Sequence, residues 1–505
     1  MAPPVDTSVD DLTRAADWED TQRATVRADR YGPRGIRGGG RMPYVASPTE
    51  ARGTTNQVCG LYPFAVSAGA PLIGTPMGQH QRNGGSICFD PIRWFEAGLT
   101  SNPNLFIAGQ PGLGKSQSVR RMVLGYAYAG VTSLVLGDLK PDYADLITAL
   151  GGQVIRIGPG RDRINPLDAG PWRQALPLLD ERAAGLVRNA VISRRRNMIE
   201  ALGTLVRRRP LDDGEAAVLS AAVRHLAAHE TDVQPTLQDV VDVIGQGPPE
   251  VRRVTLDRGD DTRYQAATDA LMRTLLAVLD GPLGATFDGQ TTAPIDLNTV
   301  AVCVDISHIG VTDEQLTAGA LLASWSYGFA QVEAAHLLAD LGLAPKRRFF
   351  AVMDELWRAL RAPGLVDRLD GLTRLSRAQG TGLAYITHSL DDLEALGHEA
   401  DRAKARGIAE RCAAKLLGGL SREQLLRFGQ IVELSESEIS EVTSWADQEG
   451  WTRLAAGPAR SITKSPGVGK FLLKIGSRPG LPVYLNPTEV EKQLGDTDAR
   501  FRVGR

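Results

Sequence analysis

Short runs of apolar residues recur along the chain, separated by longer segments with helical spacing. Runs rich in aliphatic and β-branched residues are Leu105–Gly109, Ser133–Asp138, Val154–Gly158, Val300–Ile306, Phe349–Glu355 and Leu383–Ser389. Strands that are apolar at consecutive positions are typical of a parallel sheet covered by helices on both faces. The pattern therefore predicts an α/β fold with a mainly parallel sheet, which binds its ligands at the carboxyl ends of the strands.

One long segment departs from this alternation, because it contains only helical signals. Within it, Thr236 and Asp239 have the spacing of a helix-starting capping box. We predict an all-α lobe at residues 171–285, inserted between two parts of the core. The first part is residues 61–170, and the second is residues 286–505, which end in further strands.

Residues 1–60 are rich in Gly, Pro and charge, which predicts a flexible N-terminal segment. Its arginines could form a docking arm for DNA or a partner protein, although a solvated linker is the more common explanation of such a segment. The amino terminus lacks the basic and then apolar regions of a secretory signal. The uncharged stretch Gln315–Val332 contains several polar residues, so a buried helix is favoured over a membrane span.

Composition narrows the choice of function. The chain has 505 residues and a formal net charge of −2, so it lacks the excess of base that broadly nucleic-acid-coating proteins carry. Its 4 cysteines are far apart and form no CxxC pair, so neither a zinc site nor a disulfide framework is indicated. We therefore expect a cytoplasmic protein in which any contact with nucleic acid is local.

The sequence GQPGLGKS fits the complete P-loop pattern GxxxxGK[ST]. An apolar run precedes it and a helical run follows it, as an anion cradle between a strand and a helix N-terminus requires. Lys115 is then expected to reach the β- and γ-phosphates of a nucleotide, and Ser116 to ligate Mg²⁺. The predicted nucleotide-binding residues are Gly109, Gln110, Pro111, Gly112, Leu113, Gly114, Lys115, Ser116 and Gln117.

A P-loop also needs an acidic residue on a neighbouring strand to hold the metal. Asp354 and Glu355 end one apolar run, and Asp305 ends another. The adjacent pair is favoured, because Asp354 could hold Mg²⁺ while Glu355 polarises the attacking water. Asp305 is more simply a turn residue at the end of its strand.

Other polar residues follow the predicted strands. His388 ends the last strand of the core and is a candidate sensor of the γ-phosphate, although a locally satisfied strand-end residue is equally plausible. Arg374 and Arg377 precede that strand and could reach a neighbouring subunit's nucleotide or face solvent. Asp138 and Lys140 end a further strand and could lie near the nucleotide or the attacking water.

Several of these segments occur in the order found in a known family. NPNLFIAGQPGLGKS, LGDLKPDYADL, VAVCVDIS, VMDELWRAL and RAQGTGLAYITHSLDDL resemble the carboxyl-terminal ATPase region of the conjugative-transfer ATPases of type IV secretion systems. This is the TraC-like group, related to the HerA/FtsK pumps. The resemblance covers roughly Leu61 to Leu485, and only the sixty tail-like residues precede it.

The resemblance implies a RecA-like P-loop ATPase core that uses ATP and Mg²⁺ and forms a homo-oligomer, with a hexamer as the expected form. It implies partners in a membrane-embedded secretion channel, and therefore a peripheral place at the inner face of the cell membrane, with DNA or a coupling protein as a further partner. Lys115 and Ser116 match the family's phosphate and metal residues, Asp354 and Glu355 match its acid pair, and its arginine finger would be Arg374 or Arg377.

The sequence is compatible with three functions. The leading one is an ATPase that energises conjugative transfer or type IV secretion. A DNA-translocating ATPase of the HerA/FtsK kind is the alternative, supported by the arginine groups 194–196 and 207–209. A nucleotide-switched scaffold with little turnover is the third, and the complete set of P-loop and acidic residues argues against it.

Overall fold

The computed structural model describes residues 70–168, 170, 172–230, 233–309, 313–356, 380–394, 399–446 and 467–495. The predicted N-terminal segment, Arg374 and Arg377 lie outside these described residues.

The described residues form an 11-stranded sheet. Its strands are β1 (Pro76–His80), β2 (Ser86–Cys88), β3 (Asn104–Ala108), β4 (Val131–Asp138), β5 (Gln153–Arg156), β6 (Ala301–Asp305), β7 (Arg348–Met353), β8 (Gly382–Thr387), β9 (Ala414–Leu417), β10 (Lys470–Ile475) and β11 (Leu481–Tyr484). They are arranged in the order β2-β1-β11-β10-β9-β3-β8-β7-β4-β6-β5. The strands from β9 to β5 in that order are parallel, whereas β10, β11, β1 and β2 pair antiparallel.

Alternate residues of the parallel strands belong to different hydrophobic clusters. Leu105 and Ile107 of β3 pack in one cluster with residues of the helix that follows the strand, while Phe106 and Ala108 pack in the other. Because successive side chains of a strand point to opposite faces, both faces of the sheet are buried. The predicted mainly parallel α/β sheet is therefore confirmed.

Helices cover the two faces of the sheet. The first helices are α3 (Pro91–Glu96), α4 (Lys115–Ala129) and α5 (Ala144–Ala149), and α13 (Glu314–Asp340) packs against β4 from the other face. A side chain at Gly328 of α13 would lie 2.6 Å from Leu136 of β4, so glycine permits this close approach. The uncharged run predicted to be a buried helix lies within α13, and most of its side chains are buried. Within the described ranges, no helix combines the length and apolar character needed to cross a membrane.

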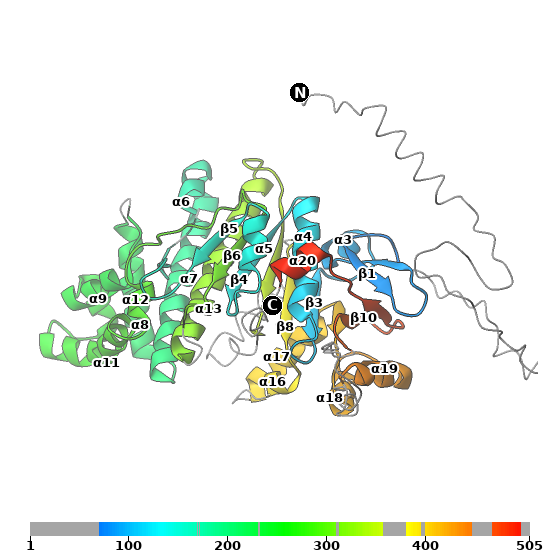
Figure 1. Ribbon diagram of the computed structural model, residues 1–505. Helices are drawn as coiled ribbons and strands as arrows, with labels where there is room; N and C mark the ends of the chain where they lie inside the picture. The colour runs from blue at the N-terminus through cyan, green and yellow to red at the C-terminus, as the bar shows by residue number, and fades with distance from the viewer. Residues whose placement is uncertain are drawn as a thin grey trace, which may run out of the picture. The chain divides into compact units, whose positions relative to one another are not determined.

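A group of helices follows β5 in the chain. They are α6 (Trp172–Ala175), a 3-10 helix (Leu176–Leu178), α7 (Glu181–Arg207), α8 (Asp213–Ala228), α9 (Leu237–Gln246), α10 (Pro249–Thr255), α11 (Asp261–Leu279) and α12 (Gly284–Phe287). Figure 1 shows α7, α8, α9 and α11 gathered beyond the β5 side of the sheet. The predicted capping box is present, because Thr236 accepts from the Asp239 amide and Asp239 accepts from the Thr236 amide. We call the helices α7 to α11 the helical segment.

The edge of the sheet opposite to β5 consists of the antiparallel strands β10, β11, β1 and β2, and the last helices of the chain follow β8. These helices are α16 (Asp391–Glu394), α17 (Glu399–Arg411), α18 (Arg422–Phe428), α19 (Glu436–Ala446) and α20 (Glu489–Leu494). The strands predicted near the carboxyl end are present as β10 and β11, whereas β1, β2 and β9 have no counterpart in the sequence prediction. Strand β9 is short and contains Lys415, whose ammonium group is buried and donates to the carbonyl oxygens of Glu410 and Cys412.

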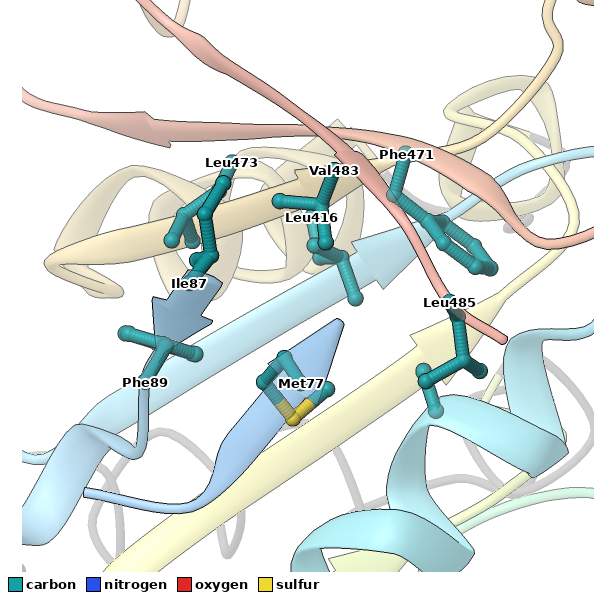
Figure 2. Close-up of a pocket in the computed structure, with 9 residues that line it drawn as sticks. Met77, Ile87, Phe89, Leu416, Phe471, Leu473, Val483 and Leu485 are labelled. Atoms are coloured by element: carbon teal, nitrogen blue, oxygen red, sulfur yellow. The ribbon is translucent and has the colours of Figure 1, made fainter. Parts of the chain in front are cut away.

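A small pocket lies between these antiparallel strands and α4. Figure 2 shows its apolar lining, which includes Met77, Ile87, Phe471 and Val483, and Ser118 of α4 completes the wall. No ionisable side chain lines it, and the Ser118 hydroxyl already donates to the carbonyl oxygen of Lys115. The pocket is therefore a packing defect of the core and offers no site for a charged ligand.

Candidate active site

The P-loop connects the carboxyl end of β3 to the first turn of α4. Gly112 and Gly114 have left-handed backbones, with φ values of 80° and 98°, which a side chain would strain. Gly114 is also the N-cap of α4, and it has no side chain to occupy the free amide groups of the first helical turn. These amides can therefore bind an anion.

Lys115 folds back over this loop. Its ammonium group donates to the carbonyl oxygens of Gly109 and Gln110, at 2.6 and 3.1 Å, and lies 3.1 Å from Nδ1 of His388. The side chain is buried, and this burial lowers the pKa of Lys115 to about 8, against the opposing effect of Asp354 and Glu355. The lysine is thus held by neutral acceptors that a phosphate group could replace.

The predicted acid pair lies directly after β7, in a turn that begins where the strand ends at Met353. Asp354 accepts from the Tyr143 hydroxyl at 2.9 Å and from the Glu355 amide at 2.8 Å. Burial, followed by the neighbouring Glu355 carboxylate, raises the pKa of Asp354 to about 6. Asp354 is therefore a carboxyl group that changes charge close to neutral pH.

Glu355 is buried and has a left-handed backbone with φ of 50°. Such a conformation is costly for a residue with a side chain and persists where surrounding contacts hold it. One carboxylate oxygen is 2.7 Å from the ammonium group of Lys140, and the other is 3.2 Å from Nε2 of His388. Burial alone would raise the pKa of Glu355, but the hydrogen bonds from His388 and Lys140 lower it well below its ordinary value.

His388 joins the P-loop lysine to the acid pair. An ammonium group can only donate hydrogen bonds, so Nδ1 of His388 accepts from Lys115. The neutral ring then carries its proton on Nε2, where it can donate to Glu355. The structure therefore brings Lys115, His388 and Glu355 into one hydrogen-bonded chain.

The loop between β4 and α5 completes the site around the P-loop, and we refer to the P-loop, this loop, Asp354, Glu355 and His388 together as the cleft. Asp138, buried at the end of β4, accepts from the amides of Asp142 and Tyr143 at 3.1 and 2.9 Å, which fixes the loop. Burial raises the pKa of Asp138 to about 7, although these amides oppose the effect. Asp142 also forms a side-chain hydrogen bond with Ser116, and burial raises the pKa of Asp142.

Asp142 and Tyr143 were not identified by the sequence analysis, although they belong to the same GDLKPDY run as Asp138 and Lys140. A signal was present, because polar residues following a buried parallel strand lie at the edge where ligands bind. The contacts with Ser116 and Asp354 depend on the order of the strands, which the sequence alone did not specify.

The donor set fits a nucleotide-bound Mg²⁺ better than a metal held by protein alone. Among the described residues, no group of three or more His, Cys, Asp or Glu side chains could hold a metal ion. Magnesium at phosphate sites usually takes one or two protein groups, with waters and phosphate oxygens as its other ligands. The Ser116 hydroxyl, already bonded to Asp142, and the nearby Asp354 suit this kind of site.

Two further glycine segments border the P-loop. The Gly418 amide donates to the Ala108 carbonyl oxygen at 2.8 Å, and the Gly469 amide donates to that of Leu113 at 3.0 Å. A side chain at Gly109 would lie 3.0 Å from the Cα atom of Gly418. These segments support the P-loop from the β9 and β10 side, and the sequence analysis did not identify them.

The remaining predicted residues lie elsewhere or outside the described part. Asp305, at the end of β6, accepts from the Ser307 amide at 2.9 Å, as a turn residue does. Gln117 lies on the first turn of α4, close to Arg120. Arg374 and Arg377 lie outside the described residues, so their predicted role in a neighbouring subunit stays a prediction.

The sheet and the P-loop define an α/β protein of the RecA-like P-loop class. Its fold is similar to that of VirB4 of Thermoanaerobacter pseudethanolicus, with a TM-score of 0.61 and 18% identity over 85% of this chain and 99% of that chain. The plasmid coupling protein TrwB, in complex with ADP and Mg²⁺, matches with a TM-score of 0.46 and 13% identity over 76% of this chain and 85% of that chain. No protein-family model matches the sequence. No curated protein matches it either.

The similarity to VirB4 confirms the predicted resemblance to type IV secretion ATPases at the level of the fold. At 18% identity it establishes the fold alone.

Proposed function

We propose that this chain is an ATP-binding and ATP-hydrolysing motor that energises conjugative transfer or type IV secretion. The observation that supports it best is the single hydrogen-bonded chain from Lys115 through His388 to Glu355, with Asp354 beside it. A P-loop lysine, a metal-holding acid and a water-polarising acid are the parts that nucleotide hydrolysis requires. The shared fold with VirB4 is the reason for choosing secretion as the process.

The cleft residues have distinct expected tasks. The amides of the P-loop and the first turn of α4 would hold the phosphates, and Lys115 would exchange its carbonyl acceptors for phosphate oxygens. Ser116 and Asp354 would hold Mg²⁺, which supplies charge stabilisation for the leaving phosphate. Glu355 would accept a proton from the attacking water.

Assembly and location form part of the same proposal. A homo-oligomer, of which a hexamer is the form expected from the resemblance, would place Arg374 or Arg377 at a neighbouring subunit's nucleotide. Channel components would hold the motor at the inner face of the cell membrane. DNA or a coupling protein would be its further partner.

A DNA-translocating ATPase is the second candidate, and the structure reduces its support. Arg195 is buried and forms a paired contact with Glu230, while Arg194 and Arg207 pair with Glu333 and Glu215. Arginines that are neutralised within the fold are poor ligands for a phosphate backbone. Within the two arginine groups, Arg208 and Arg209 are exposed, and Arg196 donates hydrogen bonds to the side-chain oxygen of its neighbour Asn197.

ATP hydrolysis should be measured against oligomeric state, with and without DNA. The motor proposal expects phosphate release by the wild-type chain and slow release by Glu355→Gln, which should still bind ATP. Equal turnover in the two proteins would overturn the assignment of Glu355. Strong stimulation by DNA with a steep salt dependence would favour the translocase, and wild-type binding without turnover would favour the scaffold.

A further inference from the structure

Lys140 forms a contact to the acid pair that the proposed mechanism does not use. Its ammonium group is 2.7 Å from a Glu355 oxygen, and His388 contacts the other oxygen. Both oxygens of the expected proton acceptor are therefore engaged. A carboxylate held in this way is a poor base for water, so the described arrangement suits a resting state.

The two side chains of this ion pair differ in how far they are exposed to solvent, and therefore in how easily they can move. The Lys140 side chain is 62% exposed, whereas that of Glu355 is 8% exposed. A buried carboxylate needs a charged or hydrogen-bonding partner, which explains why Lys140 stays beside it when no other anion is near. Because the lysine is long and largely solvated, it is the partner that can move to another anion.

The surrounding loop brings Lys140 to the phosphate side of the cleft. Two residues further on, Asp142 bonds to Ser116 at the start of α4, and Tyr143 bonds to Asp354. Asp138 fixes this loop through the amides of both residues. Lys140 therefore extends from an anchored loop whose neighbouring residues contact the proposed metal ligands Ser116 and Asp354.

We propose that Lys140 is a second phosphate-binding lysine, which distinguishes a nucleoside triphosphate from a diphosphate. Without nucleotide it pairs with Glu355. When a triphosphate occupies the P-loop, Lys140 moves to the terminal phosphate and leaves one Glu355 oxygen available to the attacking water. A diphosphate has no terminal group at this position, so the ion pair with Glu355 persists. The inference rests on the proposed nucleotide site.

The test is to measure the affinity of Lys140→Met for Mg-ADP and for a Mg-bound non-hydrolysable ATP analogue by titration calorimetry. A charge-assisted hydrogen bond contributes roughly 1.5 to 3 kcal/mol, so the affinity of the variant for the analogue should be at least about 10-fold lower than that of the wild type. The affinity for ADP should change by less than about twofold, because a diphosphate has no terminal phosphate for Lys140 to contact. Equal changes for both nucleotides, or no change for either, would overturn the inference.

Two control variants separate the role of Lys140 from a general charge effect. Lys140→Arg should keep most of the preference for the triphosphate, because it keeps a positive donor. Lys346→Met removes an exposed lysine that precedes β7, at the end of the strand opposite to the cleft, and should bind both nucleotides like the wild type. Loss of the triphosphate preference in Lys346→Met would contradict the proposal.

The exchange of partners can be tested independently of hydrolysis. Glu355→Gln removes the resting partner of Lys140, so it should bind the ATP analogue more tightly than the wild type. In a Lys140→Met background, the same glutamate change should give a smaller gain, because no lysine is released. Equal gains in both backgrounds would count against the exchange. If the wild type binds neither nucleotide, the proposed nucleotide site is wrong. That result can be distinguished from a failure of the Lys140 inference, in which the wild type binds both nucleotides.

Discussion

The cleft and the helical segment both contain positive side chains that contact acidic groups, but they use these charges differently. In the cleft, Lys115 is held by backbone carbonyls and a histidine, and Lys140 is largely solvated. In the helical segment, Arg195 is 2% exposed and forms hydrogen bonds to Glu230, Gln234 and the Leu167 carbonyl oxygen.

This difference separates charges that can change partner from charges that hold the fold together. A lysine that is held by neutral backbone acceptors, or that is itself largely solvated, can exchange its partner for a phosphate group. A buried arginine with a paired carboxylate contact would leave an unpaired buried charge if it moved. Changes in the cleft should therefore alter binding, and changes in the helical segment should alter stability.

The largest effect should come from Lys115→Ala. It removes the charged donor expected to contact the phosphates, so Mg-ATP affinity should fall by about 100-fold or more, which corresponds to about 2.7 kcal/mol. The urea midpoint should stay close to that of the wild type, because the lysine is held only by exchangeable acceptors. Calorimetry measures the affinity and urea unfolding measures the stability. A large loss of stability with intact binding would show that Lys115 stabilises the fold and does not bind nucleotide.

Arg195→Ala should show the opposite behaviour. It leaves Glu230 without its paired partner and the Leu167 carbonyl oxygen without its donor, so the free energy of unfolding should fall by about 3 kcal/mol. At a temperature where the variant remains folded, its affinity for Mg-ATP should match that of the wild type. Weaker nucleotide binding without a change in the urea midpoint would contradict this assignment.

Asp354→Asn should have a smaller effect on stability that depends on pH. The raised pKa of Asp354, about 6, means that the folded state favours the protonated acid. The stabilising contribution is complete below about pH 4 and is lost as pH rises through 6. Asparagine resembles the protonated acid, and the Tyr143 hydroxyl can turn to accept from it.

The nucleotide-free variant should therefore exceed the wild type in stability by about 1 to 2 kcal/mol at pH 8 and by almost nothing at pH 4. Urea unfolding at several pH values measures this difference. A gain of the same size at every pH would show that the titration of Asp354 is not its cause.

The smallest effect should come from Arg209→Ala. This residue is exposed beyond the end of α7, so the change should alter stability by less than about 0.5 kcal/mol. Under the secretion proposal, it should also leave ATP hydrolysis unchanged in the presence of DNA. A clear loss of DNA stimulation would instead give the helical segment a role in DNA binding.

The sequence predicted the parallel part of the fold because its signals are local. Consecutive apolar residues indicated β3, β4, β5, β6, β7 and β8, and the P-loop pattern indicated the phosphate cradle. The capping box at Thr236 and Asp239 also depends on residues only three positions apart. Strands β1 and β2 were missed because they are short and mixed in polarity, and β9 because a lysine lies among its apolar residues.

Spacing along the chain determined the fold class, the P-loop and the candidacy of Lys115, Ser116, Asp354, Glu355 and His388. Tertiary structure decided which of these touch, because the order of the strands places β8 next to β3 and β7 next to β8, although β3 is far from both in the sequence. It also decided which charges can change partner: the sequence shows basic residues in both regions, arginines in the helical segment and Lys115 and Lys140 in the cleft, but not how their burial and partners differ. The physical reason is that the ability of a charged side chain to change partner depends on its burial and on the groups around it in three dimensions, which spacing along the chain does not specify.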